Sequence, residues 1–148
     1  MKRTFSVILA LFLCLMLGCS AASATETSTN EQDEIVLYYN NTSSASTVLT
    51  ISSSGRATAT LSYTGVSGVT SGATIVSYLE AQVGSMWTRV SNGQTNNQWV
   101  DTSTSVSYNT SHSLSLSGRG KYRVRATYTI RGSGGAADVI TQYSYATY

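Results

Sequence analysis

The residues with the clearest capacity for binding chemistry are the basic side chains of the stretch SGRGKYRVRATYTIRGSGG, residues 117–135. This stretch holds five of the nine Lys and Arg residues in the 148-residue chain. Guanidinium and ammonium groups gathered in this way could bind the phosphate or carboxylate groups of an anionic partner. However, Lys121, Arg123 and Arg125 alternate strictly with Tyr, Val and Ala, as on a strand with one buried face. The spacing therefore favours the solvent side of a strand over a phosphate-binding site.

The segment YLEAQVGSMWTRV, residues 78–90, supplies further candidates. Its Gly-Ser pair predicts the turn of a hairpin that places Glu80 opposite Arg89 and brings Trp87 to the solvent-facing side. Glu80 and Arg89 are then expected to form an ion pair across the ladder. An exposed tryptophan could stack on a sugar or anchor a protein partner. A one-residue bulge would instead turn Trp87 into the core, where large aromatic side chains are more often found, and both positions stay open. The candidate ligand-binding residues are Trp87, Glu80, Arg89, Arg123 and Arg125.

The arginines of the late strand have expected partners on its neighbours. If this strand lies between the strand of Glu80 and the last strand, Arg123 and Arg125 can reach Glu80 on one side and Gln142 on the other. Exposed pairs of this kind contribute about 0–1 kcal/mol each, so replacing both arginines by Gln should leave the fold intact. Because the charge is partly neutralised, we expect weak or no salt-dependent retention on cell wall.

Side chains suited to catalysis or metal binding are sparse. The chain has one histidine, His112, and two cysteines, Cys14 and Cys19, so it cannot form a multi-histidine zinc site. His112 is in phase with the inward leucines of SHSLSLS, which favours a half-buried structural histidine. Asp101 and Asp138 are isolated in sequence, and among so many serines a Ser-His-Asp set is expected by chance. We predict that the protein is not an enzyme and has no cofactor and no metal site.

The N-terminus predicts export. Residues 1–24 begin with two basic residues, continue with an apolar run and end in Ala-Ser-Ala, the pattern of a cleaved signal peptide. The competing interpretation is a lipoprotein signal, in which a lipid on Cys19 anchors the protein at the cell surface. Residues 25–34 are polar and predict a flexible stem, and residues 35–148 predict a single β-sandwich domain. We expect a secreted, extracellular protein that meets the membrane only through the signal peptide or a Cys19 lipid.

Removal of the leader changes the charge balance. The chain has nine basic and seven acidic residues, and Lys2 and Arg3 leave with the leader, so seven of each remain. A neutral mature chain argues against a general polyanion binder, and no nucleic acid is expected as a partner. Both cysteines lie in the leader as well, so burial alone must hold the mature domain together.

The mature chain predicts an all-β domain. Ser and Thr alternate with apolar side chains along nearly every segment, and no helical period persists for three turns. We expect Leu79, Leu114, Leu116 and Val124 to share one core. The expected strands are EIVLYY, STVLTISSSG, RATATLSYTG, TIVSYLEAQV, MWTRVS, SHSLSLSG, KYRVRATYTIRG and ADVITQYSYATY.

The run GKYRV indicates the type of sandwich. A tyrosine early in a late strand, two residues before an inward position, is the tyrosine corner of immunoglobulin-like domains. Tyr122 would be this corner, and Val124 the inward residue in place of the usual cysteine. We predict an immunoglobulin-like or fibronectin type III-like antiparallel β-sandwich of about seven strands.

Four runs, ISSSGRATATLS, YLEAQVGSMWTRV, GKYRVRATYTI and YSYATY, resemble in order and spacing a family of small secreted proteins of Gram-positive, clostridial-type bacteria. The function of that family is unknown. The resemblance covers most of the mature chain. It implies an immunoglobulin-like sandwich at a Gram-positive exterior, and it carries no activity or site to this chain.

Together these observations favour a non-catalytic binding or envelope-associated module. Its expected partner is a cell-wall polymer, a glycan or a surface protein. An exposed aromatic platform around Trp87 would favour a carbohydrate- or cell-wall-binding module. The alternative from a different class is a secreted toxin or inhibitor that acts on another cell.

Overall fold

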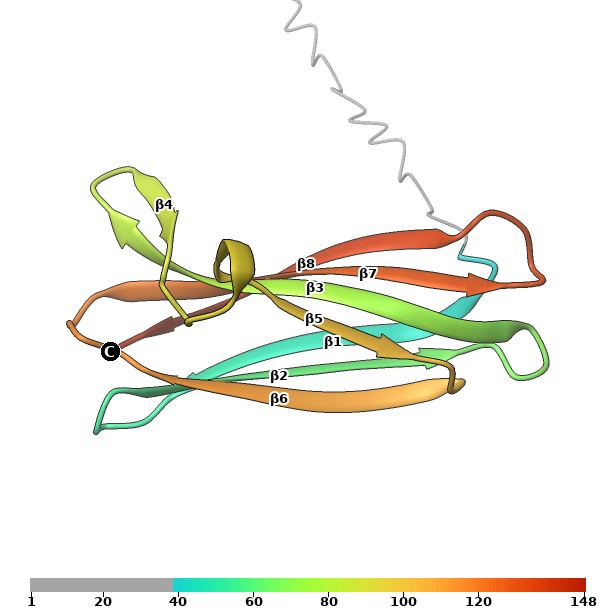
Figure 1. The fold of residues 1–148 in the computed structure, drawn as a ribbon, viewed down its shortest axis with the longest axis horizontal. Coiled ribbons are helices and arrows are strands. Elements are labelled where there is room, and N and C mark those ends of the chain that lie inside the picture. The colour runs from blue at the N-terminus through green and yellow to red at the C-terminus, as the bar shows by residue number, and fades with distance from the viewer. Residues whose placement is uncertain (1–38) are drawn as a thin grey trace, which may run out of the picture. The chain divides into compact units, whose positions relative to one another are not determined.

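Eight antiparallel strands in two sheets make up the part of the chain that the structure, a computed structural model, describes, residues 39–148 (Figure 1). The predicted leader, 1–24, and the predicted stem, 25–34, lie outside the described residues. So does the expected strand EIVLYY, except for Tyr39, which belongs to no strand. The predicted all-β sandwich is confirmed.

The first sheet has three strands in the order β1-β2-β6, and the second has β4-β3-β7-β8 with β5 also paired to β3. The strands are β1 (Thr42–Ile51), β2 (Arg56–Gly65), β3 (Thr70–Val83), β4 (Met86–Arg89), β5 (Trp99–Ser103), β6 (Ser107–Ser115), β7 (Lys121–Gly132) and β8 (Asp138–Thr147). A short 3₁₀ turn, η1 (Thr95–Asn97), precedes β5. Strand β7 lies between β3 and β8, as the sequence predicts.

Strand β3 explains why the second sheet is the larger. It is 14 residues long, and one of its edges pairs with β7 along most of that length. The other edge takes two short strands in succession, β5 beside residues 73–77 and β4 beside residues 80–83. The predicted hairpin is confirmed, and Gly84 in its turn has a φ of 62°, which glycine accommodates without strain.

The core lies between the two sheets and follows the predicted alternation. Leu61, Ile75 and Tyr128 are at most 1% exposed in one cluster. In a second cluster Leu79 and Val124 are buried, and two half-buried leucines pack against them, Leu114 of β6 and Leu116 just after that strand. The predicted common core is therefore confirmed.

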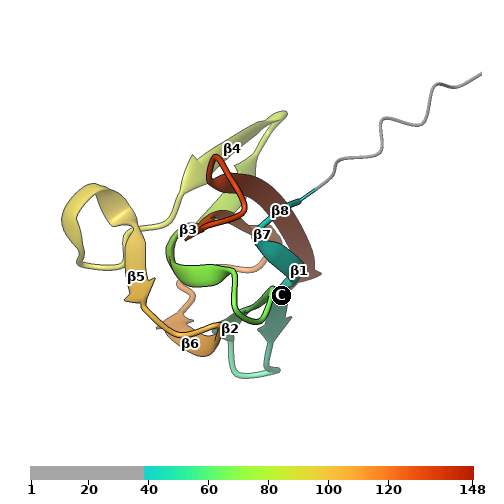
Figure 2. The ribbon, with the colours of Figure 1, turned by 90° about the vertical axis from the view of Figure 1, so that its right-hand side faces the viewer.

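Side chains join the sheets along the β1–β8 side of the sandwich, where the two strands lie next to each other (Figure 2). The Leu49 N–H donates to Ser144 Oγ at 3.0 Å, and Gln142 Nε2 donates to the Ala45 carbonyl at 2.9 Å. The Tyr128 hydroxyl reaches from β7 to the Ser46 carbonyl of β1 at 2.6 Å. These bonds satisfy backbone groups of β1 that no neighbouring strand pairs on that edge.

The tyrosine corner predicted at Tyr122 is present. Tyr122 is 7% exposed, and its hydroxyl donates to the Gly118 carbonyl at 2.6 Å. We expect Tyr122→Phe to lower the free energy of unfolding by about 1 kcal/mol, because it removes a part-buried hydrogen bond between a buried side chain and the loop before β7. Tyr143→Phe is the matched control and should change stability by less than about 0.5 kcal/mol, because Tyr143 is 44% exposed and water solvates its hydroxyl. Urea unfolding followed by circular dichroism measures both, and equal effects would contradict the role of the corner.

Candidate ligand-binding face

The five candidate residues of the sequence come together on the outer face of the five-stranded sheet. Alternation along each strand puts one residue in two on this face, and the register then aligns them across the sheet. Glu80 of β3 lies between Arg89 of β4 and Arg123 of β7, and Arg123 lies opposite Tyr145 of β8. The resulting cluster, called the arginine–aromatic face below, consists of Tyr78, Glu80, Trp87, Arg89, Arg123, Arg125, Tyr143 and Tyr145.

Trp87 stands on this outer face. The predicted register is confirmed, since Gln82 pairs with Trp87 and the Val90 N–H donates to the Leu79 carbonyl at 2.8 Å. The interpretation that a bulge turns Trp87 into the core is wrong. Trp87 is nevertheless half-buried, because other side chains of the same face cover it: the Arg123 guanidinium lies 4.4 Å from its ring centre, and Tyr145 meets it edge-on at 5.8 Å.

Glu80 and Arg123 form an ion pair beneath the aromatic side chains. Arg123 Nε donates to Glu80 Oε2 at 2.6 Å, so this predicted pairing is confirmed. Glu80 is only 7% exposed although it points away from the core. Burial alone lowers the pKa of Arg123, but hydrogen bonding and attraction to Glu80 and to Tyr145 outweigh it and raise that pKa above its usual value. Arg123 therefore stays charged in this contact.

Arg89 does not form the predicted ion pair with Glu80, although the two residues are opposite each other in the ladder. Its Nη1 donates instead to the Asn96 carbonyl at 3.0 Å, and its guanidinium lies 3.9 Å from the Tyr78 ring centre. For Arg89, attraction to an aromatic ring and a hydrogen bond to a backbone carbonyl replace the contact with the carboxylate, because Glu80 already forms its ion pair with Arg123.

Arginine and aromatic side chains alternate across the face. Arg123 stands between Trp87 and Tyr143, at 4.4 and 4.9 Å from their ring centres. Arg125 stands between Tyr143 and Tyr78, at 5.9 and 5.7 Å. Aromatic rings that pack against the faces of a guanidinium hold it in place. The N–H groups lie in the guanidinium plane and remain available to hydrogen-bond acceptors.

The expected partner of the arginines on β8, Gln142, points to the other side of the sheet. The register places Tyr143 opposite Arg125, and Gln142 opposite the buried Ala126. Gln142 is therefore a bridge to β1 and takes no part in the arginine–aromatic face. Arg125 Nε is buried and makes no hydrogen bond to any described residue.

The sequence did not single out Tyr143 and Tyr145, yet they are the most open aromatics of the face, 44% and 60% exposed. They also line a groove of about 530 Å³ between β8 and β1, whose β1 side includes Ser46 and Thr47. The signal that could have found them is the spacing in YSYATY, which puts both tyrosines on one side of the last strand.

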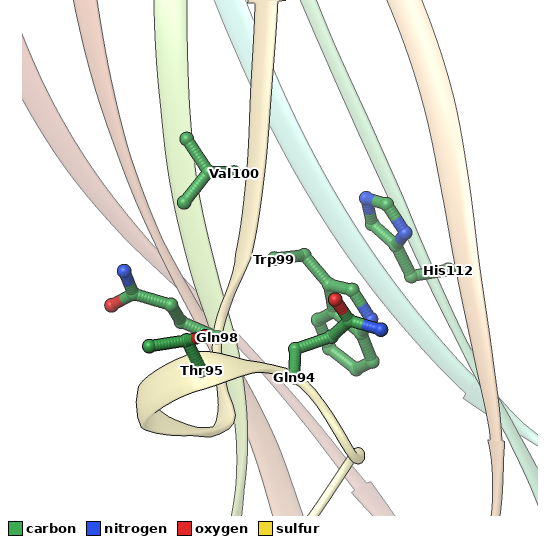
Figure 3. A pocket seen from close by; sticks show the side chains of 6 residues that line it. All are labelled: Gln94, Thr95, Gln98, Trp99, Val100 and His112. Atoms are coloured by element: carbon green, nitrogen blue, oxygen red, sulfur yellow. The ribbon is translucent and has the colours of Figure 1, made fainter.

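A second pocket, of about 350 Å³, lies between η1, β5 and β6, where Trp99 and His112 stand side by side (Figure 3). Their rings are stacked with centres 5.0 Å apart, and His112 Nε2 lies 2.8 Å from Asp101 Oδ2. His112 is half-buried, as predicted. Since β5 belongs to one sheet and β6 to the other, these contacts join the two sheets on the side away from β1 and β8.

Two further observations concern residues 39–148 only. This part of the chain contains no group of three or more His, Cys, Asp or Glu residues placed to hold a metal ion. It also contains no helix that is long and apolar enough to cross a membrane.

The fold and the face together define an antiparallel β-sandwich with an arginine–aromatic cluster on the outside of its larger sheet. No family model matches the chain, and neither the curated proteins nor the solved structures contain a match. The resemblance to secreted Gram-positive proteins therefore remains a prediction.

Proposed function

We propose that this protein is a secreted, non-catalytic binding module of a Gram-positive cell exterior, and that its ligand is a glycan bound on the arginine–aromatic face. The observation that carries the proposal is the exposure of Tyr143 and Tyr145 beside Trp87 on a rigid sheet. The leader pattern in residues 1–24 supports export, and the resemblance supports the Gram-positive setting.

The geometry of the exposed tyrosines suits a sugar. Tyr143 and Tyr145 are two residues apart on β8, with ring centres 6.5 Å apart and planes 21° from parallel. Neighbouring rings of this kind offer successive flat surfaces to the C–H faces of sugar rings, and the groove beside them supplies hydroxyl groups from β1. Because both tyrosines stand on a strand, their backbone loses little conformational freedom when a ligand binds.

The same face argues for binding without catalysis. Its carboxylate, Glu80, is bonded to Arg123 and nearly buried, whereas a general base must be free to accept a proton from a substrate. Its arginines remain protonated and cannot act as bases. The chemistry left to this face is recognition.

Retention on isolated Gram-positive cell wall tests the proposal. We expect the Tyr143→Ala, Tyr145→Ala double variant to lose at least about tenfold in affinity, because it removes both stacking surfaces. Val139→Ala is the matched control, since Val139 lies on the same face of β8, is 60% exposed and stands outside the cluster. It should bind within about twofold of the wild type. Sedimentation of labelled protein with wall measures the three, and equal retention of both variants, or no retention of the wild type, would contradict the proposal.

A further inference from the structure

We infer that the glycan is acidic, and that Arg125 binds a carboxylate carried by a sugar whose ring stacks on Tyr143. This inference rests on the proposed function and names the class of its ligand. It starts from Arg125, because Glu80 is bonded to Arg123 and the other expected partner, Gln142, is turned to the other side of the sheet.

The surroundings of Arg125 suit an anionic ligand. Tyr78 and Tyr143 flank its guanidinium, its Nε is buried, and no described residue accepts a hydrogen bond from that Nε. Because Nε itself is buried, a ligand carboxylate would meet the two terminal nitrogen atoms of the guanidinium, the end of the planar fork that can form two parallel hydrogen bonds. Because the flanking rings restrain the guanidinium, a bidentate pair with a planar carboxylate would form with little further loss of side-chain freedom.

The charge of the described residues also favours an anion. Residues 39–148 contain seven basic and three acidic residues, so the neutral balance of the mature chain depends on four acidic residues that precede residue 39. Each of the three acids already has a partner in the domain: Glu80 binds Arg123, Asp101 binds His112, and Asp138 binds Thr42. None of these three is therefore left to neutralise Arg125.

An acidic sugar fits this arrangement better than a phosphate polymer without rings. Tyr143 borders both Arg125 and the exposed Tyr145, so a carboxylate attached to a ring that lies on Tyr143 comes to the side where Arg125 stands. A chain of glycerol phosphates could meet the arginine but would leave both tyrosines unused. The expectation of weak or no salt-dependent retention assumed that Gln142 of β8 is a partner of Arg125, and the register turns Gln142 to the other side of the sheet. The present inference therefore expects retention that depends on salt.

A pair of polymers that differ only in charge tests the inference. The probes are immobilised polygalacturonate and the same polymer with its carboxylates reduced to alcohols. We expect the wild type to bind polygalacturonate at least about tenfold more tightly, and to lose most of that difference between about 50 and 500 mM salt. Arg125→Gln should lose about tenfold on polygalacturonate and almost nothing on the reduced polymer.

Arg131→Gln is the matched control, because Arg131 lies on the same face of β7, is exposed and stands outside the cluster. It should bind polygalacturonate within about twofold of the wild type. Arg125→Lys keeps the charge but not the planar fork, and it should fall between wild type and Arg125→Gln while its thermal midpoint stays close to that of the wild type. If Arg125→Gln does not fold, the Arg125→Lys variant still tests the inference.

The outcomes separate the ligand class from the proposed function. Equal binding of both polymers, with loss in the Tyr143→Ala, Tyr145→Ala variant, would overturn the acidic ligand and leave the binding module standing. Tighter binding of a soluble glycerol phosphate polymer, or equal losses in Arg125→Gln and Arg131→Gln, would also overturn it. Failure of the wild type to bind either polymer overturns the acidic ligand, and if the wild type also fails to bind isolated wall, the proposed function is overturned as well.

Discussion

Leu61→Ala is expected to lower the free energy of unfolding by about 3–5 kcal/mol. Leu61 is fully buried and packs in the same cluster as Ile75 and Tyr128, which belong to the opposite sheet. Its removal leaves a cavity between two sheets that are joined along their sides by hydrogen bonds and cannot close freely. The midpoint of urea unfolding measures the loss, and the slope of the unfolding free energy against urea concentration should be the same for the variant and the wild type.

Ser62→Ala is the control for this prediction. Ser62 is the next residue of β2 and lies on its outer face, so the change should cost less than about 0.5 kcal/mol. A similar loss at both positions would mean that the alternation of β2 does not separate core from solvent. Ala57 and Ala59, both 2% exposed, follow the same alternation.

Asp138→Asn is expected to cost about 2–4 kcal/mol at neutral pH. Asp138 is 8% exposed at the start of β8 and holds the chain that leads into β1. Its carboxylate accepts hydrogen bonds from the Asn41 N–H and the Thr42 hydroxyl, both at 2.8 Å, and from the Asn40 N–H at 3.2 Å. An asparagine has one acceptor oxygen for these donors, and its NH₂ group would face another donor.

The same carboxylate predicts a dependence of stability on pH. Burial alone raises the pKa of Asp138, but the hydrogen bonds from Thr42, Asn41 and Asn40 outweigh it and hold that pKa below its ordinary value. The stabilisation is therefore complete above the unfolded pKa of about 3.9, and it is lost as the pH falls through the lower, folded pKa. Unfolding experiments from pH 7 to pH 2 should show a smaller acid-induced loss for Asp138→Asn than for the wild type. Parallel curves would contradict this role.

The parts of the fold that a local pattern determines could be predicted from the sequence. Leu79, Val124 and the tyrosine corner at Tyr122 all follow from the period of two within one strand, which needs no knowledge of the neighbours. Strand β5 was not among the expected strands. Consequently the contact between Asp101 and His112 could not be predicted, since it depends on how β5 and β6 meet.

The candidate face shows the same division. Glu80 and Arg123 could be assigned to one side because the hairpin turn and the strict alternation determine their orientation. The same register places Trp87 on this side, but the sequence could not exclude a bulge that turns it inward. The residues of β8 on this face could not be predicted, because the register of β8 against β7 depends on the geometry of the connecting loop. A shift of that register by one residue exchanges the two faces of β8. The sequence-based expectation paired the arginines with Gln142, whereas the register brings Tyr143 and Tyr145 to that face.

The most direct test of the account is to map where soluble fragments of Gram-positive cell wall bind, from the amide signals of the isotope-labelled protein. We expect shifts that saturate and that concentrate on residues 123–125 of β7 and 143–145 of β8, the centre of the arginine–aromatic face. Shifts concentrated on the three-stranded sheet or around Trp99, or no shifts at all, would contradict the claim that this face is the binding site.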